Sequence, residues 1–190
     1  MTVRLTLISP ATNEALREVR FDDDAPLDPA GTARAEAVAP SLAPASRAYA
    51  SPSERCRRTA EALGLRAEPA GELAACDMGS WRGRTLADVA ASEEPAVADW
   101  LSDPSAAPHG GESLRDLRHR VAAWLDALGT TSGPVTVVAE PDVVRAAVLH
   151  ALAAPDSTSW RLDVRPLSAV HLTGRAGRWN VRVGEELGTA

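Results

Sequence analysis

The sequence contains no lysine: all 20 of its basic residues are arginine, set against 26 aspartate and glutamate residues. Without an amine side chain, Schiff-base chemistry and the phosphate-binding lysines of P-loop NTPases and protein kinases are excluded. The formal charge of −6 disfavours a general nucleic-acid binder, because contact with a phosphate backbone needs a basic face. Coding bias in a GC-rich genome accounts for the use of arginine alone without any functional cause.

Cysteines and long apolar runs are also scarce. The two cysteines, Cys56 and Cys76, are too few for a disulfide framework and lack the spacing of metal ligands, so we predict reduced thiols, no metal and no other cofactor. No apolar run approaches the ~20 residues that span a bilayer. The first eight residues are too short and too alternating for a signal peptide. We therefore expect a cytoplasmic protein that does not bind membranes.

The chain has 190 residues, 45% of them hydrophobic, which suits one compact domain spanning residues 1–190. Residue patterns predict strands over 3–8, 47–51, 134–139, 168–172 and 179–183. They predict helices over 28–42, 51–63, 112–128 (stopped by Gly129) and 142–153. The loops are predicted at 9–24 and 65–108, the second with short helical pieces around Leu86 and Trp100, and residues 184–190 are predicted to fray.

Strands that alternate with helices predict an α/β fold, a three-layer α/β/α sandwich with a mostly parallel central sheet. In such sheets, ligands bind beyond the carboxyl ends of the strands. The loops at residues 9–13, 51–55 and 140–142 are therefore the places to look for a site.

Five segments occur in an order typical of one known family. They are PLDPAG at 26–31, ASPSERCRRTA at 50–60, DMGSWRGRTL at 77–86, GGES at 110–113 and VVRA at 143–146. Together they resemble the histidine phosphatase superfamily, also called phosphoglycerate mutase-like, over nearly the whole chain. The resemblance implies the phosphoglycerate mutase-like version of the predicted sandwich.

Members of that family carry Arg-His-Gly after the first strand, and this histidine becomes phosphorylated. A second arginine lies in a Ser-Pro-x-x-Arg segment, a glutamate serves as the acid, and a second histidine follows the fourth core strand. The chemistry explains each residue, since an imidazole attacks phosphorus, guanidinium groups hold the phosphoryl oxygens and a carboxyl protonates the leaving alcohol.

The resemblance places different residues at most of these positions. The Arg-His-Gly segment corresponds to Ser9, Pro10 and Ala11. Proline has no nucleophilic side chain and no backbone N–H, so Pro10 can neither be phosphorylated nor donate a hydrogen bond to phosphate. The acid corresponds to Ala75 and the second histidine to Glu140.

Two further positions complete the comparison. An asparagine that the family carries later in the first loop corresponds to Leu16, whereas Arg55 keeps the family's identity and is the predicted substrate-binding residue. Two unit charges ~4 Å apart at an effective dielectric near 20 interact by about 4 kcal/mol, so a carboxylate at position 140 repels a phosphoryl group. A buried arginine needs an anion, and we predict that Glu140 pairs with Arg55 across the pocket.

Two other residues remain candidates for the missing groups. His109 precedes the GGES segment and could approach the pocket, although an ordinary surface histidine is the simpler interpretation. Glu72 lies three residues from Ala75 and could be a displaced acid. The remaining histidines, at 119, 150 and 171, fall in predicted helices or in a late strand, away from the carboxyl edge of the sheet.

Three functions stay open on these residues. The first is a pseudoenzyme, a histidine-phosphatase-like protein that binds a small molecule, a protein partner or a second copy of itself. The second is other chemistry in the same cleft, with Glu140, Arg55 and Asp142 as candidates, although Asp142 and Pro141 also suit the start of a helix. The third is an atypical phosphatase that uses His109 or water as its nucleophile. Fold membership alone does not decide among them.

Overall fold

The computed structural model describes residues 2–21, 23–128 and 132–183. Its centre is a six-stranded sheet in the order β3-β2-β4-β1-β5-β6. The strands are β1 (Val3–Ile8), β2 (Arg47–Ala50), β3 (Glu68–Pro69), β4 (Gly133–Val138), β5 (Ala169–Arg175) and β6 (Arg178–Arg182). The helix stop predicted at Gly129 and the frayed tail predicted at 184–190 lie outside the described residues.

Strands β1 to β4 run parallel to one another, and β5 and β6 add an antiparallel edge. The central position of β1 explains its composition. Its alternate residues Val3, Leu5 and Leu7 are buried in the largest apolar cluster, and Leu5 lies opposite Val135 on one side and Leu172 on the other. The predicted mostly parallel sheet is confirmed.

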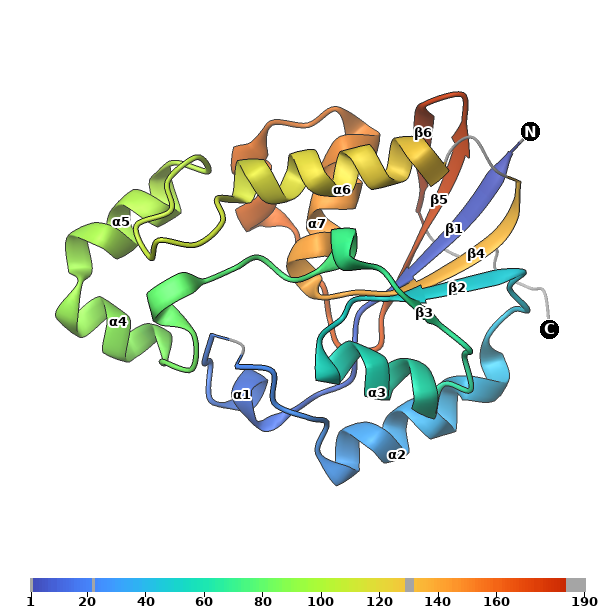
Figure 1. Ribbon diagram of the computed structural model, residues 1–190, viewed down its shortest axis with the longest axis horizontal. Coiled ribbons are helices and arrows are strands. Elements are labelled where there is room, and N and C mark those ends of the chain that lie inside the picture. Colours follow the sequence, from blue (N-terminus) through green and yellow to red (C-terminus); the bar gives the residue numbers. More distant parts are fainter. Residues whose placement is uncertain (1, 22, 129–131, 184–190) are drawn as a thin grey trace.

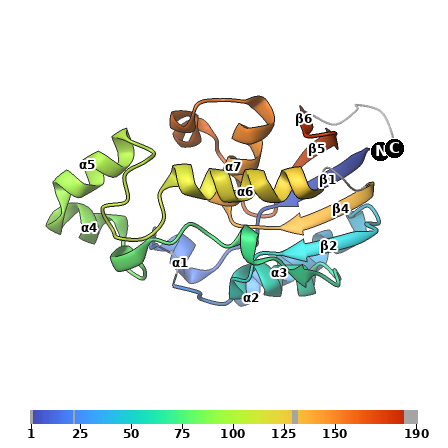
Figure 2. The same cartoon turned by 45° about the horizontal axis from the view of Figure 1, so that its top comes forward.

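Helices cover both faces of the sheet (Figures 1 and 2). Helices α6 (Leu114–Leu128) and α7 (Pro141–Leu152) lie on one face, and α2 (Pro29–Val38) and α3 (Glu54–Ala62) lie on the other. The predicted α/β/α sandwich is therefore confirmed. In the described residues no helix is long and apolar enough to cross a membrane.

Local sequence signals set where the helices begin. Asp28 accepts a hydrogen bond from the Gly31 amide (2.5 Å) and precedes Pro29, the first residue of α2. The Ser53 hydroxyl does the same for the Cys56 amide (3.2 Å) at the start of α3. Ser53 lies three residues after the end of β2, so its cap holds the first turn of α3 at the carboxyl edge of the sheet.

Two elements differ from the prediction, and two short helices confirm it. The loop predicted at residues 9–24 contains a short helix, α1 (Glu14–Arg17), which Asn13 caps by accepting the Leu16 amide at 3.0 Å. A two-residue strand, β3, extends the sheet edge through backbone pairing with Tyr49 and Ala50, a pattern with no local signal. The helical pieces predicted near Leu86 and Trp100 are α4 (Leu86–Ser92) and α5 (Glu94–Ser102), which project from the carboxyl end of the sheet (Figure 1).

An aromatic cluster attaches α4 and α5 to the rest of the molecule. The buried Trp81 ring lies 5.5 Å from Phe21 and 5.7 Å from Trp100, measured between ring centroids. Trp100 on α5 then meets Trp160 edge to face at 4.6 Å. Because Trp160 comes from the segment after α7, these contacts hold α5 close to the carboxyl end of the sheet.

Candidate functional site

A cavity of about 250 Å³ opens at the carboxyl edge of the parallel strands. Its wall comes from α1, α3, α5, the start of α6, the start of α7, the loop at 75–78, and the segment at 159–160. The lining residues are Ala15, Leu16, Arg20, Phe21, Arg55, Ala75, Cys76, Met78, Trp100, Leu114, Glu140, Pro141, Asp142, Arg145, Ser159 and Trp160. Of the three loops predicted to form a site, those at 51–55 and 140–142 contribute to this cavity, and the loop at 9–13 does not line it.

Arg55 and Glu140 form the predicted ion pair in this wall. The Nη2 atom of Arg55 contacts Oε2 of Glu140, and Nε donates to Oε1 at 3.3 Å. Both side chains are buried, with 7% and 5% of their surface exposed. The carboxylate therefore occupies two donors of the one arginine that keeps the family's identity at the site.

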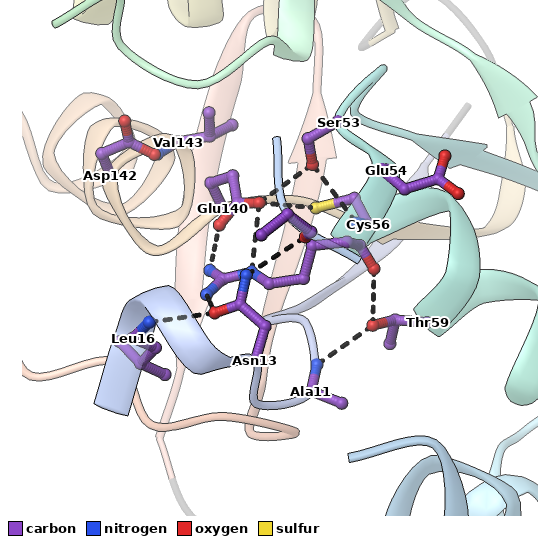
Figure 3. Close-up of polar contacts among 12 residues, drawn as sticks. Ala11, Asn13, Leu16, Ser53, Glu54, Cys56, Thr59, Glu140, Asp142 and Val143 are labelled. Carbon is purple, nitrogen blue, oxygen red and sulfur yellow. Dashed lines mark hydrogen bonds and ion pairs between the residues drawn. The ribbon is translucent and has the colours of Figure 1, made fainter. Parts of the chain in front are cut away.

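Further polar contacts fix the carboxylate in place (Figure 3). Ser53 donates its hydroxyl to Oε1 of Glu140 at 2.9 Å, and the Cys56 thiol lies 3.4 Å from the same oxygen. Burial, followed by the nearby Glu140 charge, raises the pKa of the Cys56 thiol. Cys56 is thus a buried neutral thiol, not an activated one.

Asn13 joins the pair from the first loop. Its Oδ1 atom accepts from Nη1 of Arg55 at 3.4 Å and from the Leu16 amide, while its side-chain amide donates to the Ala25 carbonyl at 3.2 Å. The sequence indicated only the loop at residues 9–13, which ends at Asn13. The Asn-x-x-Leu spacing ahead of a helical turn is the signal that could have identified it as a cap.

Asp142 serves the backbone, as its position at a helix start suggested. Its two oxygens accept from the Cys76 amide at 2.7 Å and the Val143 amide at 2.8 Å. Pro141 is the first residue of α7 and Glu140 precedes it as the N-cap. The Cys76 thiol donates to the Glu112 carbonyl at 3.2 Å, and burial raises its pKa.

The four positions where the family's reactive groups would fall do not all reach the cavity. Ala75 and Glu140 lie on its wall, whereas Ser9 and Pro10 are buried and contribute nothing to the lining. The Ser9 backbone is tied to the segment before β5, with its amide donating to the Ser168 carbonyl at 3.0 Å. Ser9 therefore does not border the cavity that Arg55 lines.

His109 is buried, so its interpretation as a surface histidine is wrong. Its Nδ1 atom accepts from the Gly111 amide at 3.1 Å, and its ring packs on Trp81 with centroids 5.1 Å apart. Burial lowers its pKa, which favours the neutral ring. It does not line the cavity, and Glu72 is exposed on the surface. Neither residue supplies the missing imidazole or acid.

Two close backbone contacts set the loop that carries Met78. A Cβ atom at Gly79 would lie 2.1 Å from the His109 carbonyl oxygen, and Gly79 has a positive φ of 47°. A Cβ atom at Gly111 would lie 2.0 Å from the Asp77 carbonyl oxygen. Only glycine fits either position, which explains why the DMGSW and GGES segments occur together.

We expect Gly79→Ala to lower the free energy of unfolding by about 2–4 kcal/mol, because the new methyl group meets backbone at a left-handed residue. Urea denaturation followed by far-UV circular dichroism measures this change. Gly71→Ala is the matched control, since a Cβ atom there meets nothing within 4 Å. Equal stabilities of the two variants would contradict the expectation.

The site offers no metal centre in the described residues, where no group of three or more histidine, cysteine, aspartate or glutamate side chains is arranged to hold an ion.

Most of the apolar wall of the cavity could not be predicted from the sequence. Phe21, Met78, Trp100, Leu114 and Trp160 come from five separate segments, and no local pattern links them.

The relatives of this chain include a curated protein and several solved structures, of which two are described here. The chain is 31% identical over 123 residues to the bifunctional protein Rv2228c of Mycobacterium tuberculosis, which is 64% of this chain and 33% of that protein, so the chain spans about a third of its length. The mycobacterial glucosyl-3-phosphoglycerate phosphatase Rv2419c in complex with VO3 superposes with a TM-score of 0.85 and 26% identity, covering 95% of this chain and 97% of that one. YhfR from Bacillus stearothermophilus gives a TM-score of 0.85 at 22% identity, covering 95% and 96%.

The family model for the histidine phosphatase superfamily (branch 1) matches residues 10–186. That match covers nearly the whole chain and agrees with the fold and with the order of the five segments. The chain belongs to the histidine phosphatase superfamily, branch 1.

Proposed function

We propose that this chain is a catalytically inactive member of its superfamily, and that its cleft binds a small ligand without phosphohistidine chemistry. A protein partner and a second copy of the chain remain further candidates for binding elsewhere on the surface.

The observation that carries the proposal is the buried Arg55–Glu140 pair. A phosphoryl group would need the guanidinium of Arg55, and the Glu140 carboxylate already occupies it. Bringing a dianion into the same space places like charges together, which costs several kcal/mol at ~4 Å and an effective dielectric near 20. The cavity therefore disfavours phosphate at the position where the family's chemistry takes place.

The residues around this pair supply no replacement nucleophile. Pro10 falls where the family's phosphorylated histidine would be, and among the described residues no imidazole lines the cavity. Cys56 and Cys76 are buried thiols with raised pKa values, so neither is a thiolate at neutral pH.

A phosphatase with atypical catalytic residues is the second candidate. Its support is the name of the mycobacterial relative, a phosphatase that shares the fold. Such an enzyme would use water, or would need His109 to leave its contacts with Trp81 and Gly111. Other chemistry in the cleft would need Glu140 to leave Arg55 before it could act as a base.

We expect the purified protein to hydrolyse p-nitrophenyl phosphate, phosphoserine and sugar phosphates no faster than a buffer blank. Arg55→Ala and His109→Ala are the matched variants, because each removes a group that a phosphatase mechanism would use. Incubation with ³²P-labelled substrate followed by alkaline gel analysis tests for phosphohistidine.

Turnover by the wild-type protein that Arg55→Ala abolishes would overturn the proposal and support the atypical phosphatase. Turnover that only His109→Ala abolishes would overturn it as well, and would identify the nucleophile. Turnover that persists in both variants would point to a contaminating phosphatase, and a second preparation with different chromatography would then decide.

A further inference from the structure

Much of the cavity wall is apolar and aromatic. Trp100 meets Trp160 at 4.6 Å with the ring planes at 75°, and it meets Phe21 at 5.9 Å with the planes at 80°. Met78 and Leu114 complete this surface. Rings arranged edge to face offer flat surfaces to a further ring, so this wall suits a planar apolar group.

Arg145 is the charged residue of the wall that no carboxylate neutralises in the described part of the chain. Its one hydrogen bond there runs from Nε to the Leu162 carbonyl, at 2.7 Å, which leaves the two Nη groups as donors. Arg55 is paired with Glu140, and Arg20 is paired with Glu18 at 2.5 Å. A ligand anion would therefore find its partner at Arg145.

Ser159 also lines the cavity. It is 9% exposed and is next in sequence to Trp160. Its carbonyl accepts from the Leu162 amide at 3.4 Å, and the Leu162 carbonyl in turn receives Nε of Arg145. The backbone of this turn thus links Ser159, which precedes Trp160, to the guanidinium of Arg145 through Leu162.

The size and charge of the cavity limit what it can take. At about 250 Å³ it lies below the ~300–1,000 Å³ of drug-sized sites, so one or two rings with a short side chain would fill it. Its wall holds three arginines and two carboxylates, Glu140 and Asp142. Because Arg20 and Arg55 are already paired with carboxylates in the described residues, Arg145 is the wall arginine left for a ligand anion. One guanidinium matches a monoanion better than a dianion.

We propose that the cavity binds a small aromatic monocarboxylic acid, with its ring against Trp100, Phe21 and Trp160 and its carboxylate on Arg145 and Ser159. This inference rests on the proposed function, because a working phosphatase would take a phosphate ester in the same space. It adds the chemical class of the ligand and the residues that recognise each end of it.

Isothermal titration calorimetry with three matched probes tests the proposal on the full chain. The probes are 3-phenylpropanoate, 3-phenylpropan-1-ol and phenyl phosphate, which share a ring and differ in charge. We expect 3-phenylpropanoate to bind at least tenfold more tightly than the alcohol, and phenyl phosphate to bind no more tightly than the alcohol. Arg145→Gln should remove the preference for the carboxylate and leave the affinity for the alcohol unchanged.

Two controls separate recognition from folding. Arg161→Gln changes an exposed arginine beside Trp160 that does not line the cavity, and it should bind all three probes as the wild type does. Trp100→Leu should weaken the carboxylate and the alcohol by the same factor. The thermal unfolding midpoint of each variant shows whether it is folded at the titration temperature.

The proposal is overturned if the alcohol binds as tightly as the carboxylate, if Arg145→Gln keeps the preference, or if none of the probes binds. Those results would leave the proposed lack of phosphatase activity untouched, because the hydrolysis assay tests it separately. Release of phosphate from phenyl phosphate during the titration would instead contradict the proposed function. The two failures are therefore distinguishable in one experiment.

Discussion

Replacing Arg55 with methionine is expected to lower the free energy of unfolding by about 3–5 kcal/mol, because it leaves the buried Glu140 carboxylate without its cation. Glu140→Leu should cost a similar amount for the opposite reason, since it leaves a buried guanidinium without an anion. Both side chains are at most 7% exposed, so water cannot compensate either charge well. Urea denaturation at pH 7 measures both changes.

The double variant Arg55→Met/Glu140→Leu is expected to recover most of that loss, since apolar residues of similar volume often replace a buried ion pair at little cost. Arg58→Met on the same helix is the matched control. Arg58 is 55% exposed and pairs with Glu54 and Glu61 at the surface, so its removal should change stability by less than about 1 kcal/mol. Single variants at position 55 or 140 that unfold like the Arg58 control would show that the buried pair does not stabilise the fold.

Glu140→Gln is expected to bind inorganic phosphate, which we expect the wild-type protein not to bind. The amide keeps the shape of the side chain but removes the charge, so it no longer repels an anion and Arg55 loses its competing partner. The interaction removed is about 4 kcal/mol at ~4 Å and an effective dielectric near 20, which corresponds to at most about a thousandfold in affinity. Titration calorimetry with phosphate and with vanadate measures the gain.

The control for this gain is Glu140→Gln/Arg55→Met, which should bind neither anion. Both variants lose the Glu140 carboxylate, but only Glu140→Gln keeps the Arg55 guanidinium. A difference in anion binding between the two variants therefore reports the guanidinium and not the loss of stability. Phosphate binding by the wild type at the same affinity as Glu140→Gln would contradict the view that the carboxylate excludes the anion.

Much of the fold follows from short patterns in the sequence. The alternation of β1, the Asp28-Pro29 helix start and the one-sided apolar face of α6 each arise from neighbouring residues, so periodicity identifies them. The Arg55–Glu140 pair was also predictable. Its prediction depended on the resemblance, which places Arg55 and Glu140 at two positions of one family site, and on the need of a buried arginine for an anion.

The rest of the site depends on contacts between distant segments. Trp100 and Trp160 come together only because α5 meets the segment that follows α7, and nothing near either residue indicates this. The burial of His109 follows from the close approach of Gly79 and Gly111, which joins two loops about thirty residues apart. Strand β3 exists through pairing with β2, since a Glu-Pro pair has little tendency to extend by itself.

The contacts from Trp81 through Trp100 to Trp160 place three indole rings within 6 Å of their neighbours, from the buried core to the rim of the cavity. Indole transitions at such separations couple, so the near-ultraviolet spectrum of the protein should respond to any change in ring orientation at the rim. Near-ultraviolet circular dichroism of these tryptophans can therefore follow occupancy of the cavity without an attached dye.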